Sequence, residues 1–272
     1  MMYSRLNETN SKRFGYYFDH QLLKNDNGFR KIGTFIFFLV FLALISLVWV
    51  PIQEYTQKRN QKVFQKQKER ILFSRLIEME HIHQVISSYN TGLSNEQEIR
   101  LAKGIQDFSE EYDLDPYLTL AIIRTESFFN PKAVSFAGAE GLMQILPPTG
   151  EQLAGELGFH YQENQILFHP LVNIHMGTRY LSQMLKVFGG NLDLALMAYN
   201  RGPNDVALSL EEGREVPMGY ANRVWFHYNR LITRKERDVP RILKNFAIIP
   251  HPETVPISLV RNRLLASFKV PN

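Results

Sequence analysis

A segment near the middle of the 272-residue chain reads Ala121-Ile122-Ile123-Arg124-Thr125-Glu126-Ser127-Phe128-Phe129-Asn130-Pro131. It places one carboxylate, Glu126, at the end of an apolar helical run, just before an aromatic pair and a proline. A carboxyl group in such surroundings is expected to be partly desolvated, which favours its protonated form and makes it a general acid near neutral pH. The alternative is an exposed Glu in a last helical turn, and this segment alone favours that alternative.

The composition limits the kinds of protein and site to be considered. With 44% hydrophobic residues, a chain of this length can bury a sizeable core in one or two folded units. It has no Cys, which excludes disulfides, thiolate metal sites and a Cys nucleophile. Residues 1–90 carry 13 Lys and Arg against 7 Asp and Glu, whereas residues 91–272 carry 18 against 20. The larger part is therefore nearly neutral, which argues against a nucleic acid partner.

Residues 32–50 form an apolar run without a single charged side chain. As a helix rising about 1.5 Å per residue, this run is close to the thickness of a bilayer core. Arg30-Lys31 precedes it and Trp49-Pro51 closes it, as is typical of side chains at the membrane interface. A buried core helix is disfavoured by the long charge-free run, and a cleaved signal peptide by the absence of a small-residue cleavage site. We therefore predict a transmembrane helix over residues 32–50, preceded by a short, poorly ordered tail over residues 1–31.

Residues 51–90 are rich in Gln, Lys, Arg and Glu. From Leu72 onward their apolar side chains recur at helical spacing and form a stripe along one face of a helix. We predict one long helix over about residues 54–89, which could act as a stalk or pair with a copy of itself or with a cell-envelope complex. His81 and His83 lie two residues apart and would point in different directions on a helix, so they are interpreted as solvated or stripe residues instead of metal ligands.

The next region predicts a mostly helical domain over residues 91–239. Thr91-Gly92 breaks the preceding helix, and Ser94-Asn95-Glu96-Gln97 has the pattern of a capping box. Asp115-Pro116 then opens the helix that ends at Glu126 and Ser127. Further helices are predicted over residues 149–157, 171–188, 192–199 and 220–234. Residues 240–272 contain five prolines between short apolar runs, and we expect an extended tail there.

Four motifs in this domain follow one another in a recognisable order. They are Glu126-Ser127; Ser135-Phe136-Ala137-Gly138-Ala139-Glu140-Gly141-Leu142-Met143-Gln144; Asn173-Ile174 with Gly177 and Tyr180-Leu181; and Ala198-Tyr199-Asn200-Arg201-Gly202-Pro203. Together they resemble the lytic transglycosylase family over about residues 95–235. The resemblance implies a mainly α fold of the lysozyme-like, goose type (α+β), and an enzyme that acts on peptidoglycan.

The resemblance also implies the roles of individual residues. Glu126 would be the catalytic group. The implied substrate-binding residues are Ser127, Ser135, Gly141, Met143, Gln144, Tyr199, Asn200 and Tyr220. The residue types agree in part with these roles, because Gln144 offers both a donor and an acceptor to sugar hydroxyl and acetamido groups. Gly138 and Gly141 would allow a sugar ring to lie against the main chain. The alternative for Tyr199 and Asn200 is a core side chain and a helix C-cap.

The mechanism implied by the family uses one carboxyl group, whereas most glycosidases use two. Glu126 would protonate the oxygen that leaves the muramoyl residue, and the N-acetyl group of the substrate would stabilise the positive carbon. The carboxylate would then take the proton of the six-position hydroxyl, which gives a 1,6-anhydromuramoyl end. The resemblance implies no metal and no cofactor. A second carboxylate stays open, and Glu140 is the first candidate for a hydrolytic partner.

The location of the substrate suggests an orientation for the apolar run. Basic residues flank both of its ends, so charge bias does not decide the orientation. A domain that cleaves peptidoglycan must reach it, so we expect a single-pass protein of the inner membrane with everything after Pro51 in the periplasm. The alternatives are a lysozyme-type hydrolase on the same fold and a non-catalytic wall-binding or assembly scaffold. Arg201 departs from the family pattern, since a small residue is usual there, and it could contact peptide carboxylates of the substrate or narrow the groove.

Overall fold

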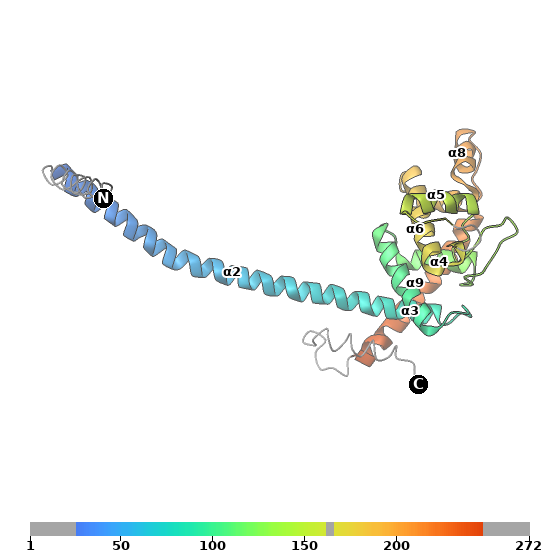
Figure 1. Ribbon diagram of the computed structural model, residues 1–272, viewed down its shortest axis with the longest axis horizontal. Helices are drawn as coiled ribbons and strands as arrows, with labels where there is room; N and C mark the ends of the chain where they lie inside the picture. The colour runs from blue at the N-terminus through green and yellow to red at the C-terminus, as the bar shows by residue number, and fades with distance from the viewer. Residues whose placement is uncertain (1–25, 162–165, 247–272) are drawn as a thin grey trace, which may run out of the picture. The chain divides into compact units, whose positions relative to one another are not determined.

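The computed structural model describes residues 26–161 and 166–246. Within these ranges the regular elements are all helices (Figure 1). They are α2 (Asp26–Ile86), α3 (Asn95–Glu111), α4 (Pro116–Glu126), α5 (Pro147–Leu157), the short 3-10 helix η1 (Ile166–Phe168), α6 (Pro170–Val187), α7 (Leu192–Arg201), α8 (Pro203–Glu211) and α9 (Gly219–Phe246). The predicted mainly helical class is confirmed.

The chain divides into two compact units, Met1–Lys68 and Glu69–Asn272. In the first unit, α2 carries the apolar run, and its large hydrophobic side chains from Phe35 to Ile52 are exposed. By length and composition α2 is able to cross a membrane, with a mean hydropathy of 2.8 over its most apolar 18-residue window.

Two expectations for this first unit were wrong in detail. Residues 26–31, expected in the N-terminal tail, belong to α2, and residues 1–25 lie outside the described residues. α2 also continues through Pro51, where we expected one helix to end and another to begin. Proline removes one backbone hydrogen bond at a cost of about 3 kcal/mol, and the long helix on either side of Pro51 retains its own bonds.

In the second unit the last three turns of α2 contribute to the core, so this unit begins well before residue 91. Ile77, Ile82 and Val85 are buried, whereas Leu72, the first residue of the expected stripe, is exposed. Ile86, the last residue of the predicted stripe, is buried as well, and Met79 packs against the core, so the buried face overlaps the C-terminal part of the stripe and extends to Ile82 and Val85. His81 is also buried and not solvated: its Nδ1 lies 2.8 Å from the hydroxyl of Tyr117, and burial lowers its pKa to about 4.

Local capping signals begin the two helices that lead to Glu126. Ser94 and Gln97 form the predicted capping box of α3, and Asp115 accepts a hydrogen bond from the backbone N–H of Tyr117 at the start of α4. These caps satisfy backbone donors that no helical carbonyl can reach. The starts of α3 and α4 are therefore the elements that the sequence predicts best.

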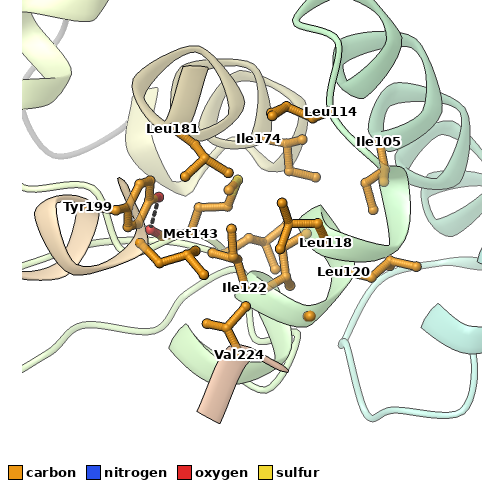
Figure 2. Close-up of a cluster of buried hydrophobic side chains, with 14 of the residues drawn as sticks. Ile105, Leu114, Leu118, Leu120, Ile122, Met143, Ile174, Leu181, Tyr199 and Val224 are labelled. Carbon is orange, nitrogen blue, oxygen red and sulfur yellow. Dashed lines mark hydrogen bonds between the residues drawn. The ribbon is translucent and has the colours of Figure 1, made fainter. Parts of the chain in front are cut away.

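α4 is the central element of the second unit, and all its residues from Tyr117 to Ile123 are buried. Figure 2 shows Leu118, Leu120 and Ile122 of α4 among side chains from the surrounding elements. These neighbours include Ile105 of α3, Ile174 and Leu181 of α6, Tyr199 of α7 and Val224 of α9. Burial of this kind contributes roughly 1.5–3 kcal/mol for each large apolar side chain. The core thus fixes α4, and with it the position of Glu126 at its C-terminal end.

The C-terminal part of the domain differs from the sequence prediction in two ways. α8 was not predicted, although Pro203 at its first turn and Asp205 next to it are helix-start signals. α9 continues through Pro240 to Phe246, so residues 240–246 are helical and not an extended tail; residues 247–272 lie outside the described residues. Ile242, beyond the proline, is only 4% exposed, and its packing explains why the helix continues there.

Candidate active site

A cleft of about 350 Å³ lies at the C-terminal ends of α4 and α7. Its walls come from the end of α4, the loop of residues 130–146, α6 and the α7–α8 junction. The described residues that line it are Glu126, Ser135, Ala137, Ala139, Gln144, Ile145, Leu146, Thr149, Tyr180, Tyr199, Asn200, Arg201 and Gly202. Among them Glu126 is the one carboxylate. The cleft therefore presents a single acidic group among hydroxyl, amide and apolar side chains.

Glu126 is the last residue of α4, and its carboxyl group is largely withdrawn from water. Burial raises its pKa from the ordinary 4.5 to about 7, because a charged carboxylate loses its hydration there. Two groups of α9 act in the opposite direction. The hydroxyl of Tyr220 donates a hydrogen bond of 2.5 Å to Oε1 of Glu126, and the positive charge of Arg223 also favours the carboxylate. The balance leaves a carboxyl group that changes protonation near neutral pH.

The 130–146 loop, which forms one wall of the cleft, is held by the buried side chain of Asn173. Its Oδ1 accepts a hydrogen bond of 2.7 Å from the backbone N–H of Met143. Its Nδ2 donates to the carbonyl oxygens of Glu140 at 2.9 Å and Leu167 at 2.8 Å. Asn173 lies on α6, so this helix holds the loop backbone through two hydrogen bonds and η1 through the third. Within the loop the only β pairing is at isolated bridges, Val134 with Glu140 and Glu140 with Ile145.

Two glycines of the sequence motifs are required by this packing. Gly141 has a φ of +80°, and a Cβ there would lie 2.3 Å from the carbonyl oxygen of Leu167 and 2.4 Å from Nδ2 of Asn173. A Cβ at Gly177 would lie 2.4 Å from Sδ of Met143. Gly141 is buried and does not line the cleft. The group that packs against it is the side chain of Asn173, and not a position that a sugar ring in the cleft could take. Gly138, with a φ of +79°, has open space around it.

Met143 and Tyr199 connect the loop to α7. The Met143 side chain is fully buried in the core, and its carbonyl oxygen accepts a hydrogen bond of 2.8 Å from the hydroxyl of Tyr199 (Figure 2). The ring of Tyr199 lies on the cleft wall, with its centroid 5.3 Å from that of Tyr180. The sequence left open whether Tyr199 is a core side chain or a residue of the binding site. In the structure it is both buried in the core and part of the cleft wall.

The other predicted substrate-binding residues fall into two groups. Ser135 and Gln144 line the cleft. Nε2 of Gln144 donates to the carbonyl oxygens of Ala133 at 3.0 Å and Gly141 at 2.9 Å, which leaves its Oε1 as an acceptor. Ser127 is buried instead, and its hydroxyl donates to the carbonyl oxygen of Leu142 at 2.8 Å.

The end of α7 supplies the rim of the cleft. Asn200 is exposed there, with its side chain beside the cleft. Arg201 also lines the cleft, and its Nε lies 2.6 Å from Oδ2 of Asp205 one turn further along the chain. This ion pair holds Arg201 at the rim, where its remaining guanidinium donors can still meet a substrate.

Sequence reasoning left Arg223 out of the site, and Tyr180 was quoted only as part of a motif. Arg223 follows Tyr220 by three residues on α9, so both lie on one helix face, and this spacing is a signal that could have found it. Glu140, the candidate second carboxylate, does not line the described part of the cleft. No group of three side chains suited to a metal ion occurs among residues 26–161 and 166–246.

If the chain cleaves glycan strands, as the resemblance of its sequence motifs implies, the hydroxyl of Tyr220 is expected to set the pH at which cleavage declines. It stabilises the carboxylate of Glu126, so Tyr220→Phe should raise the pKa of Glu126 further above about 7. If the protonated form starts the reaction, kcat/KM falls as the pH rises through this pKa, and the variant should show the fall at a pH higher by up to about one unit. The measurement is kcat/KM against pH with solubilised glycan strands. The control is Tyr228→Phe, which removes a hydroxyl that is hydrogen-bonded to Asp115, the N-cap residue of α4. If the fall of kcat/KM at high pH occurs at the same pH in Tyr220→Phe as in wild type, this role of Tyr220 is wrong.

Residues 103–216 match the family described as Transglycosylase SLT domain. The soluble lytic murein transglycosylase of Salmonella typhimurium is 40% identical over 95 residues, which are 35% of this chain and 15% of that protein. The chain spans about a sixth of the length of the curated relatives it matches.

Two solved structures align with about half of this chain. The 70 kDa soluble lytic transglycosylase of Escherichia coli is 30% identical, with a TM-score of 0.43, over 47% of this chain and 23% of that one. An inactive mutant of the lytic transglycosylase Slt of Pseudomonas aeruginosa is 34% identical, with a TM-score of 0.39, over 46% and 20%. Residues 103–216, which the family model matches, include α4, the 130–146 loop, α6 and α7. Residues 103–216 therefore match the transglycosylase SLT domain family, in agreement with the resemblance of the four sequence motifs to lytic transglycosylases.

Proposed function

We propose that the chain is a lytic transglycosylase that cleaves the β-1,4 bond between MurNAc and GlcNAc in peptidoglycan and leaves 1,6-anhydromuramoyl ends. One observation carries the proposal: Glu126, with a pKa of about 7, is the one carboxylate among the described residues of the cleft. A group that acts first as an acid and then as a base needs a pKa near the working pH. The family match and the names of the curated relatives support the same reaction class.

In the first step of the proposed reaction, the protonated carboxyl of Glu126 gives its proton to the glycosidic oxygen. The bond from that oxygen to the anomeric carbon of the muramoyl residue breaks, and the N-acetyl group of the substrate stabilises the positive carbon. In the second step the Glu126 carboxylate takes the proton of the six-position hydroxyl, whose oxygen forms a bond with the same carbon. Glu126 thus regains in the second step the proton that it gave up in the first, and no water is consumed. The hydrogen bond from Tyr220 supports the carboxylate between the two steps.

Neutral groups of the cleft are suited to hold a sugar chain in this reaction. Oε1 of Gln144 and the side chain of Asn200 offer acceptors and donors for hydroxyl and acetamido groups. The rings of Tyr180 and Tyr199 supply the apolar surface on which a sugar face can lie. We therefore propose glycan strands as the substrate, with Glu126 beside the bond that is cleaved.

The decisive experiment is mass analysis of the fragments released from purified sacculi by the full chain and by its Glu126→Gln variant. Anhydromuramoyl fragments that disappear with the variant would support the proposal. Fragments with hydrolysed reducing ends would show a muramidase instead. A wild-type chain that releases no fragments would be a wall-binding or assembly protein, and the proposal would be wrong.

We also propose that α2 anchors the domain in the inner membrane, with the second unit in the periplasm. The exposed apolar side chains of residues 32–50 have no other partner among the described residues, and a bilayer would cover them. Protease added to intact spheroplasts is expected to degrade the second unit and to leave a short fragment around residues 32–50. Protection of the second unit from the external protease, with degradation only after lysis, would contradict this topology.

A further inference from the structure

A second hollow, of about 790 Å³, lies on the side of α4 opposite to the cleft. Its wall includes Arg124 of α4, Tyr89 and residues of α9, and it shares no lining residue with the cleft. Arg124 and Glu126 are two positions apart on α4, which separates their directions by about 200° around the helix axis. The same helix thus presents its carboxyl to the cleft and a guanidinium to this hollow.

The hollow is strongly basic. Four arginines line it, Arg124, Arg230, Arg234 and Arg237, and no carboxylate occurs among its described lining residues. Asp238 lies close by and is shared by two of them, at 3.3 Å from Nε of Arg234 and 2.9 Å from Nε of Arg237. One carboxylate for four guanidinium groups leaves an excess of positive charge.

Arg124 and Arg230 carry this excess, because neither has a carboxylate partner among the described residues. The guanidinium of Arg124 lies 3.7 Å from the ring centroid of Phe128 and 5.3 Å from that of Tyr89. Its Nη1 is buried and has no hydrogen-bond partner there. Arg230 lies over Phe226 at 5.5 Å. The aromatic rings orient both guanidinium groups, and no carboxylate among the described residues neutralises either of them.

His227, which also lines the hollow, responds to this charge. Its pKa is lowered by burial and by the positive charges of Arg124 and Arg230. The imidazole therefore stays neutral at neutral pH, and the positive potential at this place comes from the arginines. An anion placed between them would oppose that effect and raise the pKa of His227 again.

We propose that this hollow binds a phosphate or diphosphate group with at least two negative charges. Two guanidinium groups without carboxylate partners are neutralised only by a ligand that carries more negative charge than a single carboxylate. The planar fork of arginine also matches pairs of phosphate oxygens. The group could belong to a soluble phosphate compound or to the headgroup of an anionic lipid. Both sources present the same oxygens to Arg124 and Arg230.

The test is isothermal titration of the full chain in micelles of an uncharged detergent. Inorganic diphosphate represents the soluble source, and a short-chain phosphatidic acid dispersed in the same micelles represents the lipid source. We expect saturable binding of at least one probe, and a Kd about tenfold weaker in Arg230→Gln and in Arg124→Gln, because each loses a charged donor. Arg214→Gln, on an exposed turn outside the hollow, is the matched control and should bind within twofold of wild type.

The outcomes separate the sources and can overturn the inference. Binding of diphosphate alone assigns a soluble ligand, and binding of phosphatidic acid alone assigns a lipid headgroup. The inference is wrong if neither probe binds saturably, or if Arg230→Gln binds both as tightly as wild type. Arg230 is exposed, so its variant decides the question even where Arg124→Gln does not fold. Cleavage of sacculi by Arg230→Gln should equal that of wild type, since the residue lies outside the cleft.

Discussion

Replacing Glu126 by Gln is expected to lower the rate of sacculus cleavage by about 10³-fold, the largest effect of any single change in the cleft. General acid–base groups contribute roughly 10²–10⁴-fold, and Glu126 would supply both proton transfers. Gln keeps the shape of the side chain and an oxygen for the hydroxyl of Tyr220, so the fold should persist. The measurement is the initial rate of release of soluble fragments from sacculi by the full chain.

The matched control for this prediction is Glu140→Gln. Glu140 lies in the same loop region, and its carboxylate does not line the described cleft. Its variant should retain activity within about twofold, because removal of a group that touches neither proton transfer leaves the barrier unchanged. A loss in Glu140→Gln as large as that in Glu126→Gln would indicate a second catalytic carboxylate, and the account with one carboxyl group would be wrong.

Glu126→Gln should also show how much the raised pKa of Glu126 lowers the stability of the folded chain at high pH. The pKa of Glu126 is about 7 in the folded chain and near its ordinary 4.5 when unfolded, so its contribution to stability is fully present below pH 4.5 and is lost as the pH rises through 7. That difference corresponds to about 3 kcal/mol at higher pH. The neutral Gln avoids it, so the melting temperature of the variant should exceed that of wild type at pH 8 and approach it at pH 4. An equal difference at both pH values would contradict the shifted pKa.

Asn173→Ala is expected to have the largest effect on stability among the polar residues near the cleft. The substitution leaves the N–H of Met143 and the carbonyl oxygen of Leu167 buried without their partner, whereas the carbonyl oxygen of Glu140 keeps its bond from the N–H of Ile145. Unsatisfied buried groups cost about 1–3 kcal/mol each, and we expect a total loss of about 3–5 kcal/mol with partial relaxation. In calorimetry of the full chain the melting temperature should fall by roughly 10 °C.

Activity should follow stability in this variant, because Asn173 positions the loop that forms the cleft wall. Asn204→Ala is a suitable control, since Asn204 is exposed in the first turn of α8. It should change the melting temperature by no more than about 2 °C, as surface substitutions usually do. A melting temperature of Asn173→Ala as high as that of the control would show that the hydrogen bonds of Asn173 do not stabilise the loop and η1.

The parts of the fold that could be predicted are those that local chemistry specifies. Ser94 with Gln97 and Asp115 with Pro116 act within one helical turn, so the starts of α3 and α4 follow from neighbouring residues. The position of Glu126 at the end of α4 follows in the same way. The order of the motifs then indicated the family that residues 103–216 match.

The parts that could not be predicted depend on contacts between residues far apart in the chain. Tyr220 meets Glu126 across 94 positions, and Asn173 reaches the backbone of Met143 across 30. The burial of His81 and the continuation of α9 past Pro240 are likewise decided by packing partners, which override the local tendencies of a histidine and a proline. No periodicity in the sequence reports such pairs.

In the proposed reaction Glu126 acts alone, and the six-position hydroxyl of the substrate replaces water. This reaction is tested most directly by digestion of sacculi with the full chain in water labelled with heavy oxygen, followed by mass analysis of the muramoyl ends. The expected products are anhydro ends without incorporated label, and these ends should be lost with Glu126→Gln. Reducing ends that carry one labelled oxygen would show that water attacks the sugar, and would rule out internal attack by the six-position hydroxyl.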